Sequence, residues 1–348
     1  MSKIYSNPFV WGVPVTGSRY LTRPVEEEQI HSCIEKKQPL VLTGYRGSGK
    51  TSMMQAVASK FHGVSMYLDL GFVVGEESTI NLLKQQIKVT FPELKDDARL
   101  NSNTTGEAEA FASVSQLLFD HIKDKDKKLM IIWDEFQHVI KLKEDVLGLI
   151  KKNIAGRRDV MHVFISHRED QMQQTFGVKG DRFFPKTQFL HLENLGREAI
   201  KSYLTKNFRQ MGLTDFDLPE SIINFTNCQP CLTQKFAHAI ARCWLEGTTT
   251  RLMERASKKL LDEEDTSFAR WWDGFGVNEK RLFLGLANGY SRPTELGFID
   301  QFGLSATSTA HNTVLKLLRE GWLVNRDEGY YIYDPLFLLW LKNRNNIT

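Results

Sequence analysis

The sequence predicts an α/β fold: a doubly wound parallel sheet, then a helical domain, then a small domain of helices and two strands. Short apolar runs alternate with helical patterns between Leu40 and Leu192, as expected for βαβ units. From Leu195 to about Phe268 the pattern is entirely helical. The chain then ends in helices and a β-ribbon, which together indicate a winged helix. The expected domains are a core over 1–192 with an N-terminal arm over 1–24, a helical lid over 193–276 and a winged helix over 277–348.

Composition is that of an ordinary soluble protein. The 348 residues are enough for two or three domains, and the 45 Lys and Arg nearly balance the 42 Asp and Glu. Because no basic tail is present, any DNA binding must come from a local surface. The chain has no apolar run of roughly 18 residues and no signal-peptide layout at its start. We therefore expect a cytosolic protein that does not bind membranes.

Four cysteines are too few for a disulfide framework in a cytosolic chain of this size. Cys228 and Cys231, with His238 and Cys243, have the outline of a zinc site. The residues between Cys231 and Cys243, however, follow the pattern of an amphipathic helix. We favour buried thiols over zinc.

A glycine-rich stretch fits G-x-x-x-x-G-K-[ST] without a mismatch and lies between an apolar run at 39–43 and a helical pattern at 51–58. It reads Gly44-Tyr45-Arg46-Gly47-Ser48-Gly49-Lys50-Thr51, followed by Ser52. Strand, loop and helix is the order that a phosphate-binding loop requires, with its backbone N–H groups turned around a triphosphate at a helix N-terminus. Lys50 would reach the β- and γ-phosphates, and the Thr51 hydroxyl would bind Mg²⁺.

The segment before this loop, from Asn7 to Arg23, is rich in Pro, Gly and aromatic residues, so we expect it to be irregular. A helix should follow from about Val25 to Lys36. A loop in this position can cover an adenine ring, with Tyr20 and Arg23 as candidates. The alternative is an N-terminal arm that only packs against the domain.

A second strand over 64–70 and helices around 79–89 and 107–121 lead to the apolar run Leu129–Trp133, which ends in two carboxylates. The polar segment 92–105 between them should be an exposed loop. Such a run predicts a buried parallel strand that delivers Asp134 and Glu135 to the carboxyl edge of the sheet, a Walker B pattern. Asp134 would hold Mg²⁺, and Glu135 would orient or deprotonate the attacking water. Taken alone, an acidic pair at this point is equally consistent with a helix N-cap.

A helix over about 145–154, ending at Gly156, precedes the next strand, 159–166. That strand ends in Ser166, His167 and Arg168, and Ser166 is the candidate sensor of the γ-phosphate or the attacking water. A polar strand end without this role is the alternative. A loop over 177–186 containing Arg182 then leads to the last core strand, 188–192.

The helical domain should form a lid over the nucleotide. Trp271, Trp272 and Phe275 fall in the connecting segment after it, where we expect them to pack domains together.

The final domain should contain helices over 278–286, 292–303 and 305–319, with Val314, Leu315 and Leu318 as apolar positions of the third. Two short strands follow, 322–324 and 330–333, joined by the turn 326–329. The third helix exposes polar side chains suited to a major groove: Thr307, Ser308, His311, Asn312 and Lys316. Because the charge of this domain is nearly balanced, a protein-contact or autoinhibitory module remains the alternative to DNA binding.

The order of these motifs resembles the archaeal ATPase family, a group close to the STAND and AAA+ ATPases that is also found in bacteria. The resemblance covers nearly the whole chain, and the phosphate loop and the Asp-Glu-Phe-Gln stretch are its specific marks. Its marks are Asn7-Pro8-Phe9, the arm around Tyr20–Glu27, the loop Gly44–Ser52, Trp133-Asp134-Glu135-Phe136-Gln137, and Asp334-Pro335-Leu336-Phe337 with Trp340.

This resemblance implies an AAA+-like ATPase core, a helical lid and a winged helix, in the broad layout of archaeal replication initiators. It also implies a role for Arg182, which stands where such proteins carry an arginine before the last core strand. In a homo-oligomer this arginine can reach the γ-phosphate bound by a neighbouring subunit. A surface arginine in a loop is the alternative.

The chain departs from the family pattern in two places. The family often has Ser-Gly-Ser after the sensor strand, where this chain has Ser166-His167-Arg168, so either Ser166 or Arg168 can be the sensor. It also often has Gly-x-Pro at the start of a lid helix, where this chain has Cys228-Gln229-Pro230. Many relatives continue into a nuclease-like domain, so we expect any effector activity here to need a partner protein.

From these observations we expect an ATP-hydrolysing switch in which Mg-ATP binds between core and lid and repositions the winged helix, for DNA engagement or effector recruitment. The alternative is a nucleotide-stabilised sensor or assembly module with little turnover that acts through a protein partner, for example in defence or a mobile element. No Asn-Lys-x-Asp motif is present, so ATP is expected rather than GTP.

Overall fold

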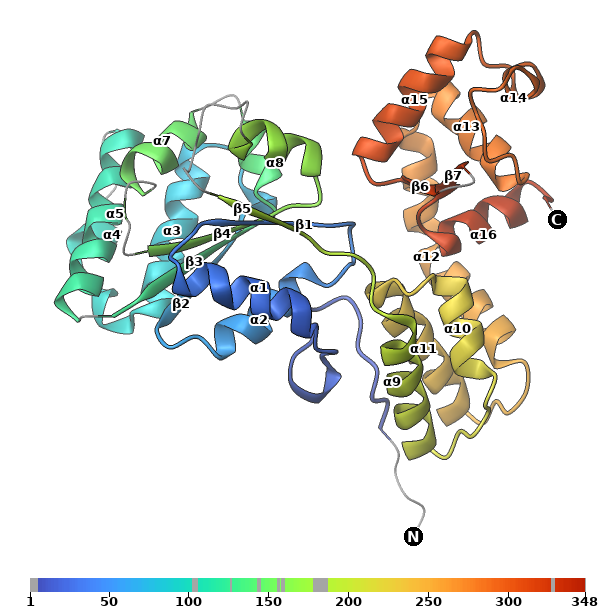
Figure 1. Cartoon of the computed structure of the whole chain (residues 1–348), viewed down its shortest axis with the longest axis horizontal. Helices are drawn as coiled ribbons and strands as arrows, with labels where there is room; N and C mark the ends of the chain where they lie inside the picture. Colours follow the sequence, from blue (N-terminus) through green and yellow to red (C-terminus); the bar gives the residue numbers. More distant parts are fainter. Residues whose placement is uncertain are drawn as a thin grey trace. The chain divides into compact units, whose positions relative to one another are not determined.

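The computed structural model (Figure 1) describes residues 6–101, 106–125, 127–142, 145–154, 157, 160–177, 187–326 and 329–347. The chain divides into two compact units. The sheet unit consists of Thr16–Tyr45 and Gly49–Glu193, and the helical unit of Met1–Val15, Arg46–Ser48 and Asn194–Thr348.

Five parallel strands form the sheet of the first unit, which confirms the predicted α/β fold. They are β1 (Leu40–Thr43), β2 (Val64–Asp69), β3 (Leu129–Asp134), β4 (Val160–Ile165) and β5 (Gln188–His191). Their order across the sheet is β2-β3-β4-β1-β5. Strand β4 therefore lies between β1 and β3, with Ile165 opposite Leu42 on one side and Phe164 opposite Trp133 on the other.

Helices cover both faces of this sheet (Figure 1), as the alternating pattern predicts. One face carries α1 (Pro24–Glu35) and α2 (Lys50–Ser59). The other carries α3 (Glu76–Thr90), α5 (Glu107–Asp124), α7 (Val146–Asn153) and α8 (Glu169–Phe176). The shorter elements are α4 (Ala98–Asn101), α6 (Gln137–Ile140) and the 3₁₀ turns Gly17–Arg19, Leu70–Phe72 and Pro92–Leu94.

The central strands β3 and β4 are buried along their whole length, which explains why they read as continuous apolar runs. Two of their residues carry polar atoms into this core. The indole Nε1 of Trp133 donates to Nδ1 of His162 at 3.3 Å. Burial lowers the pKa of His162 to about 3, so its ring is neutral and packs as an aromatic residue against Phe164.

In the helical unit, four helices follow the sheet: α9 (Arg197–Gln210), α10 (Leu218–Thr226), α11 (Pro230–Leu245) and α12 (Leu252–Gly274). The N-terminal arm packs against them, with the buried Phe9 ring against Tyr203 and Phe208 and the Asn7 amide donating to the carbonyl of His238 at 3.0 Å.

The structure corrects the expected position of two tryptophans. Trp271 and Trp272 belong to α12 and not to a connecting segment, because the helix extends to Gly274. Trp271 packs edge-on against Trp322, and Phe275 against Phe283 and Trp322, so these aromatic residues join α12 to the terminal domain.

The terminal domain contains the predicted three helices and two antiparallel strands, and one further helix. These are α13 (Val277–Ala287), α14 (Leu296–Phe302), α15 (Thr307–Arg319), β6 (Leu323–Arg326), β7 (Gly329–Ile332) and α16 (Pro335–Arg344). Helix α16 was not predicted, although its start carries two signals. Oδ1 of Asp334 accepts from the N–H groups of Leu336 and Phe337, and Pro335 takes the first helical position.

The inward face of α15 is made by Ala310, Val314 and Leu317. Leu315, an expected apolar contact, is 40% exposed. The expected apolar positions differ from the observed ones by one residue, because the apolar residues of the run Val-Leu-Lys-Leu-Leu fit two helical registers. Two of the four cysteines, Cys33 and Cys243, are buried, while Cys228 is half-buried and Cys231 exposed.

Candidate nucleotide-binding site

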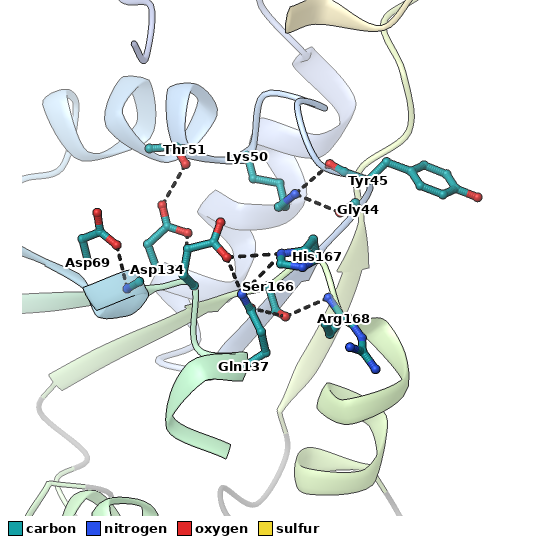
Figure 2. Close-up of polar contacts among 12 residues, drawn as sticks. Gly44, Tyr45, Lys50, Thr51, Asp69, Asp134, Gln137, Ser166, His167 and Arg168 are labelled. Atoms are coloured by element: carbon teal, nitrogen blue, oxygen red, sulfur yellow. Dashed lines mark hydrogen bonds and ion pairs between the residues drawn. The ribbon is translucent and has the colours of Figure 1, made fainter. Parts of the chain in front are cut away.

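The order of the strands brings three loops to one edge of the sheet. Because β4 is hydrogen-bonded to both β1 and β3, the ends of these strands are neighbours. The residues after β1 start the glycine-rich loop, those after β3 are Glu135 and Phe136, and those after β4 are Ser166–Arg168. Figure 2 shows Lys50, Asp134 and Ser166, from three segments far apart in sequence, within one polar cluster.

The glycine-rich loop runs from the end of β1 to Lys50, the first residue of α2. Gly47 (φ 79°) and Gly49 (φ 93°) have left-handed backbones, which glycine adopts without steric cost. Lys50 is buried, and its ammonium donates to the carbonyl oxygens of Gly44 and Tyr45, each at 2.8 Å (Figure 2). Arg46 and Ser48 lie in the middle of the loop, and Ser52 lies in the first turn of α2.

Asp134 ends β3 and joins that strand to α2. Its buried carboxylate accepts hydrogen bonds from Oγ1 of Thr51 at 2.8 Å, from the hydroxyl of Tyr67 and from the N–H of Glu135 at 2.8 Å. Burial raises the pKa of Asp134, although these three donors oppose the shift. Burial and the Asp134 carboxylate also raise the pKa of Tyr67, which therefore acts as a neutral donor.

The oxygens of Thr51 and Asp134 fit a magnesium ion. Mg²⁺ prefers hard oxygen ligands and is usually held by one or two protein groups together with substrate phosphates. A hydroxyl and a carboxylate at hydrogen-bond distance, one at the start of α2 and the other at the end of β3, provide that set. Among the described residues no group of three or more His, Cys, Asp or Glu side chains is arranged to hold a metal, and this includes Cys228, Cys231, His238 and Cys243.

Glu135 has a left-handed backbone, with φ at 54°. This conformation is unfavourable for a residue with a side chain and occurs preferentially at functional sites. Its carboxylate is 36% exposed and contacts two polar residues, the amide Nε2 of Gln137 and, at 3.2 Å, Nδ1 of His167. Glu135 is therefore held by these two neighbours while part of its side chain is exposed to solvent.

Ser166 is buried and both hydrogen-bonding capacities of its hydroxyl are used within the site. Its Oγ accepts from the N–H of Arg168 at 2.9 Å and donates to Oε1 of Gln137 at 2.6 Å. The Arg168 guanidinium pairs with Asp170 at 3.1 Å. Both candidate sensors are thus bonded to protein groups at the end of β4.

Tyr20 and Arg23, the candidates for covering adenine, take part in a network around α1. The Tyr20 hydroxyl donates to Glu27 at 3.0 Å, and the guanidinium of the buried Arg23 donates to the carbonyl of Glu193 at 2.8 Å. Burial and the Glu27 carboxylate raise the pKa of Tyr20. Arg182, the candidate arginine for a neighbouring active site, lies outside the described residues.

Two polar residues of this site carried no role in the sequence analysis. Tyr67 stands in an alternating apolar strand and looked like a packing residue, but β2 lies beside β3, which brings its hydroxyl to Asp134. Gln137 was only part of the Asp-Glu-Phe-Gln stretch. The available signal was an amide side chain two residues after a candidate base.

The comparisons with known proteins agree with this geometry. A model of the "ATPase domain predominantly from Archaea" matches residues 20–230, and one described as "Probable winged helix domain" matches residues 266–343. Since the first match covers more than half of the chain, the protein belongs to this archaeal-type ATPase family. No curated protein matches the chain.

Solved structures with the same fold include a Walker-type ATPase and two ORC proteins. A Walker-type ATPase of Pyrococcus abyssi is 16% identical, with a TM-score of 0.69 over 94% of this chain and 98% of that one. The ORC2 protein of Aeropyrum pernix is 12% identical, with a TM-score of 0.60 over 98% and 96%. The ORC1 protein of the same organism, solved in complex with DNA, is 11% identical, with a TM-score of 0.56 over 94% of each chain. These likenesses establish an AAA+-like core with a winged helix. In the described part of the chain no helix is long and apolar enough to cross a membrane.

Proposed function

We propose that this protein is an ATP-driven switch: it binds Mg-ATP at the glycine-rich loop, hydrolyses it with Glu135 as the base, and repositions its winged helix during the cycle. The observation that carries this proposal is the hydrogen bond from Thr51 to Asp134, 2.8 Å long, which joins the first turn of α2 to the end of β3. Two separate sequence motifs thereby supply one pair of oxygens suited to magnesium.

Each residue then has a role in the reaction. Backbone N–H groups of Gly44–Ser52 and the Lys50 ammonium would bind the phosphates, while Thr51 and Asp134 would hold Mg²⁺. When bound, Mg²⁺ would supply positive charge that offsets the charge of the phosphates. Glu135 accepts a proton from water as the water oxygen bonds to the γ-phosphorus and the bond to the ADP oxygen breaks.

Three parts of the proposal concern residues that contact other protein groups in the structure or that lie outside the described residues. Tyr20 and Arg23 would lie near the adenine. Ser166 would affect the reaction either as a sensor of the γ-phosphate or the attacking water, or through the residues to which it is hydrogen-bonded. Arg182 would complete the site of an adjacent subunit, which makes a homo-oligomer the active form.

We propose that DNA engagement through α15 is the output of the switch. Support comes from the exposed Thr307, Ser308, His311 and Asn312 and from the same domain order in a protein solved with DNA. One observation favours recruitment of an effector protein instead. The Lys316 ammonium is paired with Glu279 of α13, so this helix carries less free positive charge than its sequence indicates.

The test is ATP hydrolysis by wild type and Glu135→Gln, with and without duplex DNA. Loss of the base should reduce kcat by about 100-fold or more while ATP binding persists. Duplex DNA should raise the wild-type rate, and the effect should fall as salt rises. Glu109→Gln, on the surface of α5, is the matched control and should behave as wild type. Turnover of ATP by Glu135→Gln at the wild-type rate would refute the assigned base. A hydrolysis rate that does not change when DNA is added would indicate that the switch acts on a protein effector.

A further inference from the structure

A chain of hydrogen bonds leads from Arg168 at the end of β4 through Ser166 to Gln137 (Figure 2) and from there to the carboxylate of Glu135. The N–H of Arg168 donates to Oγ of Ser166, the Ser166 hydroxyl donates to Oε1 of Gln137, and Nε2 of Gln137 donates to Oε2 of Glu135. We infer that Gln137, oriented by Ser166, is a positioning residue that holds the Glu135 carboxylate for hydrolysis. The inference rests on the proposed role of Glu135 as the base.

The direction of these bonds follows from the chemistry of the groups. A backbone N–H can only donate, so the Ser166 oxygen accepts from Arg168 and has its single hydrogen left for Gln137. An amide that receives this hydrogen on Oε1 must turn its NH₂ group the other way, and there Glu135 lies. The hydrogen bond from Ser166 therefore orients the Gln137 amide so that its NH₂ group, and not its oxygen, faces the Glu135 carboxylate.

Burial makes this arrangement costly to lose. Gln137 and Ser166 are each 1% exposed, so water does not replace a bond that a substitution removes. The Glu135 side chain is 36% exposed, which leaves one side open to a water molecule. A carboxylate fixed by a buried amide on one side and exposed on the other has the geometry of a preorganised base.

His167 reinforces the same arrangement. Its Nδ1 lies 3.2 Å from Oε2 of Glu135 and 3.3 Å from Nε2 of Gln137. With a hydrogen on Nδ1 the ring donates to Glu135, and without one it accepts the second amide hydrogen of Gln137. The ring thus restrains the carboxylate directly in the first form and holds the Gln137 amide in the second.

This role differs from that of a phosphate sensor in a measurable way. A sensor contacts the nucleotide, so its loss weakens nucleotide binding as well as the rate. A positioning residue acts only through Glu135, so its loss lowers kcat and leaves the affinity for ATP in place.

The experiment compares Gln137→Met, Gln137→Glu and Ser166→Ala, by kcat, KM for ATP and equilibrium ATP affinity. Gln137→Met keeps the length of the side chain without its hydrogen bonds and should lower kcat about 10- to 100-fold, with KM within about threefold. Ser166→Ala should lower kcat by about 3- to 10-fold, since the amide can then turn over. Gln137→Glu places a second carboxylate beside Glu135 and should move the acid limb of the kcat–pH profile upward by about one pH unit.

Ser115 supplies the matched control. It is also 1% exposed, and within the described chain its hydroxyl has no hydrogen-bond partner, so Ser115→Ala should keep wild-type kcat. Thermal unfolding of all variants, with and without ATP, identifies those that fail to fold. Ser166→Thr, which retains the hydroxyl, should keep more of the wild-type rate than Ser166→Ala does.

The result separates this inference from the proposed function. If Glu135→Gln is slow but Gln137→Met and Ser166→Ala turn over at the wild-type rate, the base stands and the positioning role is wrong. A loss of ATP affinity in Ser166→Ala that matches its loss of kcat would overturn the inference in favour of a sensor. In the Glu135→Gln background, Gln137→Met should cause no further loss, and fully multiplicative losses would contradict a role through Glu135.

Discussion

The two regions with candidate functional side chains differ in how far those side chains bond to one another. At the carboxyl edge of the sheet, Asp134, Glu135 and Ser166 accept or donate hydrogen bonds within one largely buried cluster. On α15 the polar candidates are exposed, and Lys316 is paired within its own domain. A buried network has one arrangement that satisfies every group, so its chemistry can be inferred. An exposed face can adapt to different partners, so its residue types indicate its function less sharply.

The largest effect is expected from a substitution in the nucleotide-binding site itself. Lys50→Met removes the positive charge that would face the phosphates, and ATP affinity should fall about 100-fold or more, which isothermal titration would measure. Lys88→Met, at a partly exposed position of α3 where the ammonium donates to Asn101, is the control and should bind ATP as wild type does. Equal binding by the Lys50 variant would mean that the nucleotide does not lie at this loop.

A smaller effect is expected where the buried network loses one donor. Tyr67→Phe leaves Asp134 with one hydrogen bond fewer in a buried environment, so the free energy of unfolding should fall by about 1–2 kcal/mol. Urea denaturation of the nucleotide-free protein measures this. Tyr290→Phe, on the partly exposed surface of the terminal domain, should change stability by less than about 0.5 kcal/mol. If Tyr67→Phe lowered the free energy of unfolding as little as Tyr290→Phe does, the Tyr67 hydroxyl would not stabilise Asp134.

The smallest effect concerns the ion pair of the terminal domain. Burial opposes ionisation of Glu279, but the Lys316 ammonium and the N–H of Gly276 outweigh it and lower the pKa of Glu279. A lowered folded-state pKa adds stability that is present above the unfolded value, about 4.3, and is lost as the pH falls through the folded value. Glu279→Gln should therefore cost about 1 kcal/mol at pH 7, because the Lys316 end of the pair is half-exposed.

Thermal unfolding across pH checks this prediction, since the difference from wild type should shrink below about pH 4. A difference that persists at pH 3 would mean that Glu279 acts through packing. The same variant also frees Lys316, so it should strengthen DNA binding slightly if α15 contacts DNA and leave it unchanged if the helix binds a protein.

Much of the fold and the first part of the site could be predicted because the relevant signals are local. The glycine-rich loop and the acidic pair each follow an apolar strand, and parallel strands bring their carboxyl ends to the same edge. Lys50, Thr51 and Asp134 could therefore be assigned without knowing the order of the strands.

The roles of Tyr67 and Gln137 depend on which strands are neighbours and on the direction of single hydrogen bonds. The sequence contains both residues but not the pairing of β2 with β3 or the burial of the amide. The hydrogen bond from the Ser166 hydroxyl to Gln137 could not be foreseen for the same reason, and a sensor role for Ser166 stays a prediction. Trp271 was misplaced because the end of a long helix without a strong stop signal is hard to locate.

The left-handed backbone of Glu135 sets the proposed catalytic role of this residue against the stability of the fold. A glycine at this position would adopt φ 54° without the steric cost that a glutamate bears, so selection for a more stable fold alone would favour removing the carboxylate. A laboratory evolution campaign that screens for thermal stability without screening for turnover would therefore be expected to lose ATP hydrolysis at this position first.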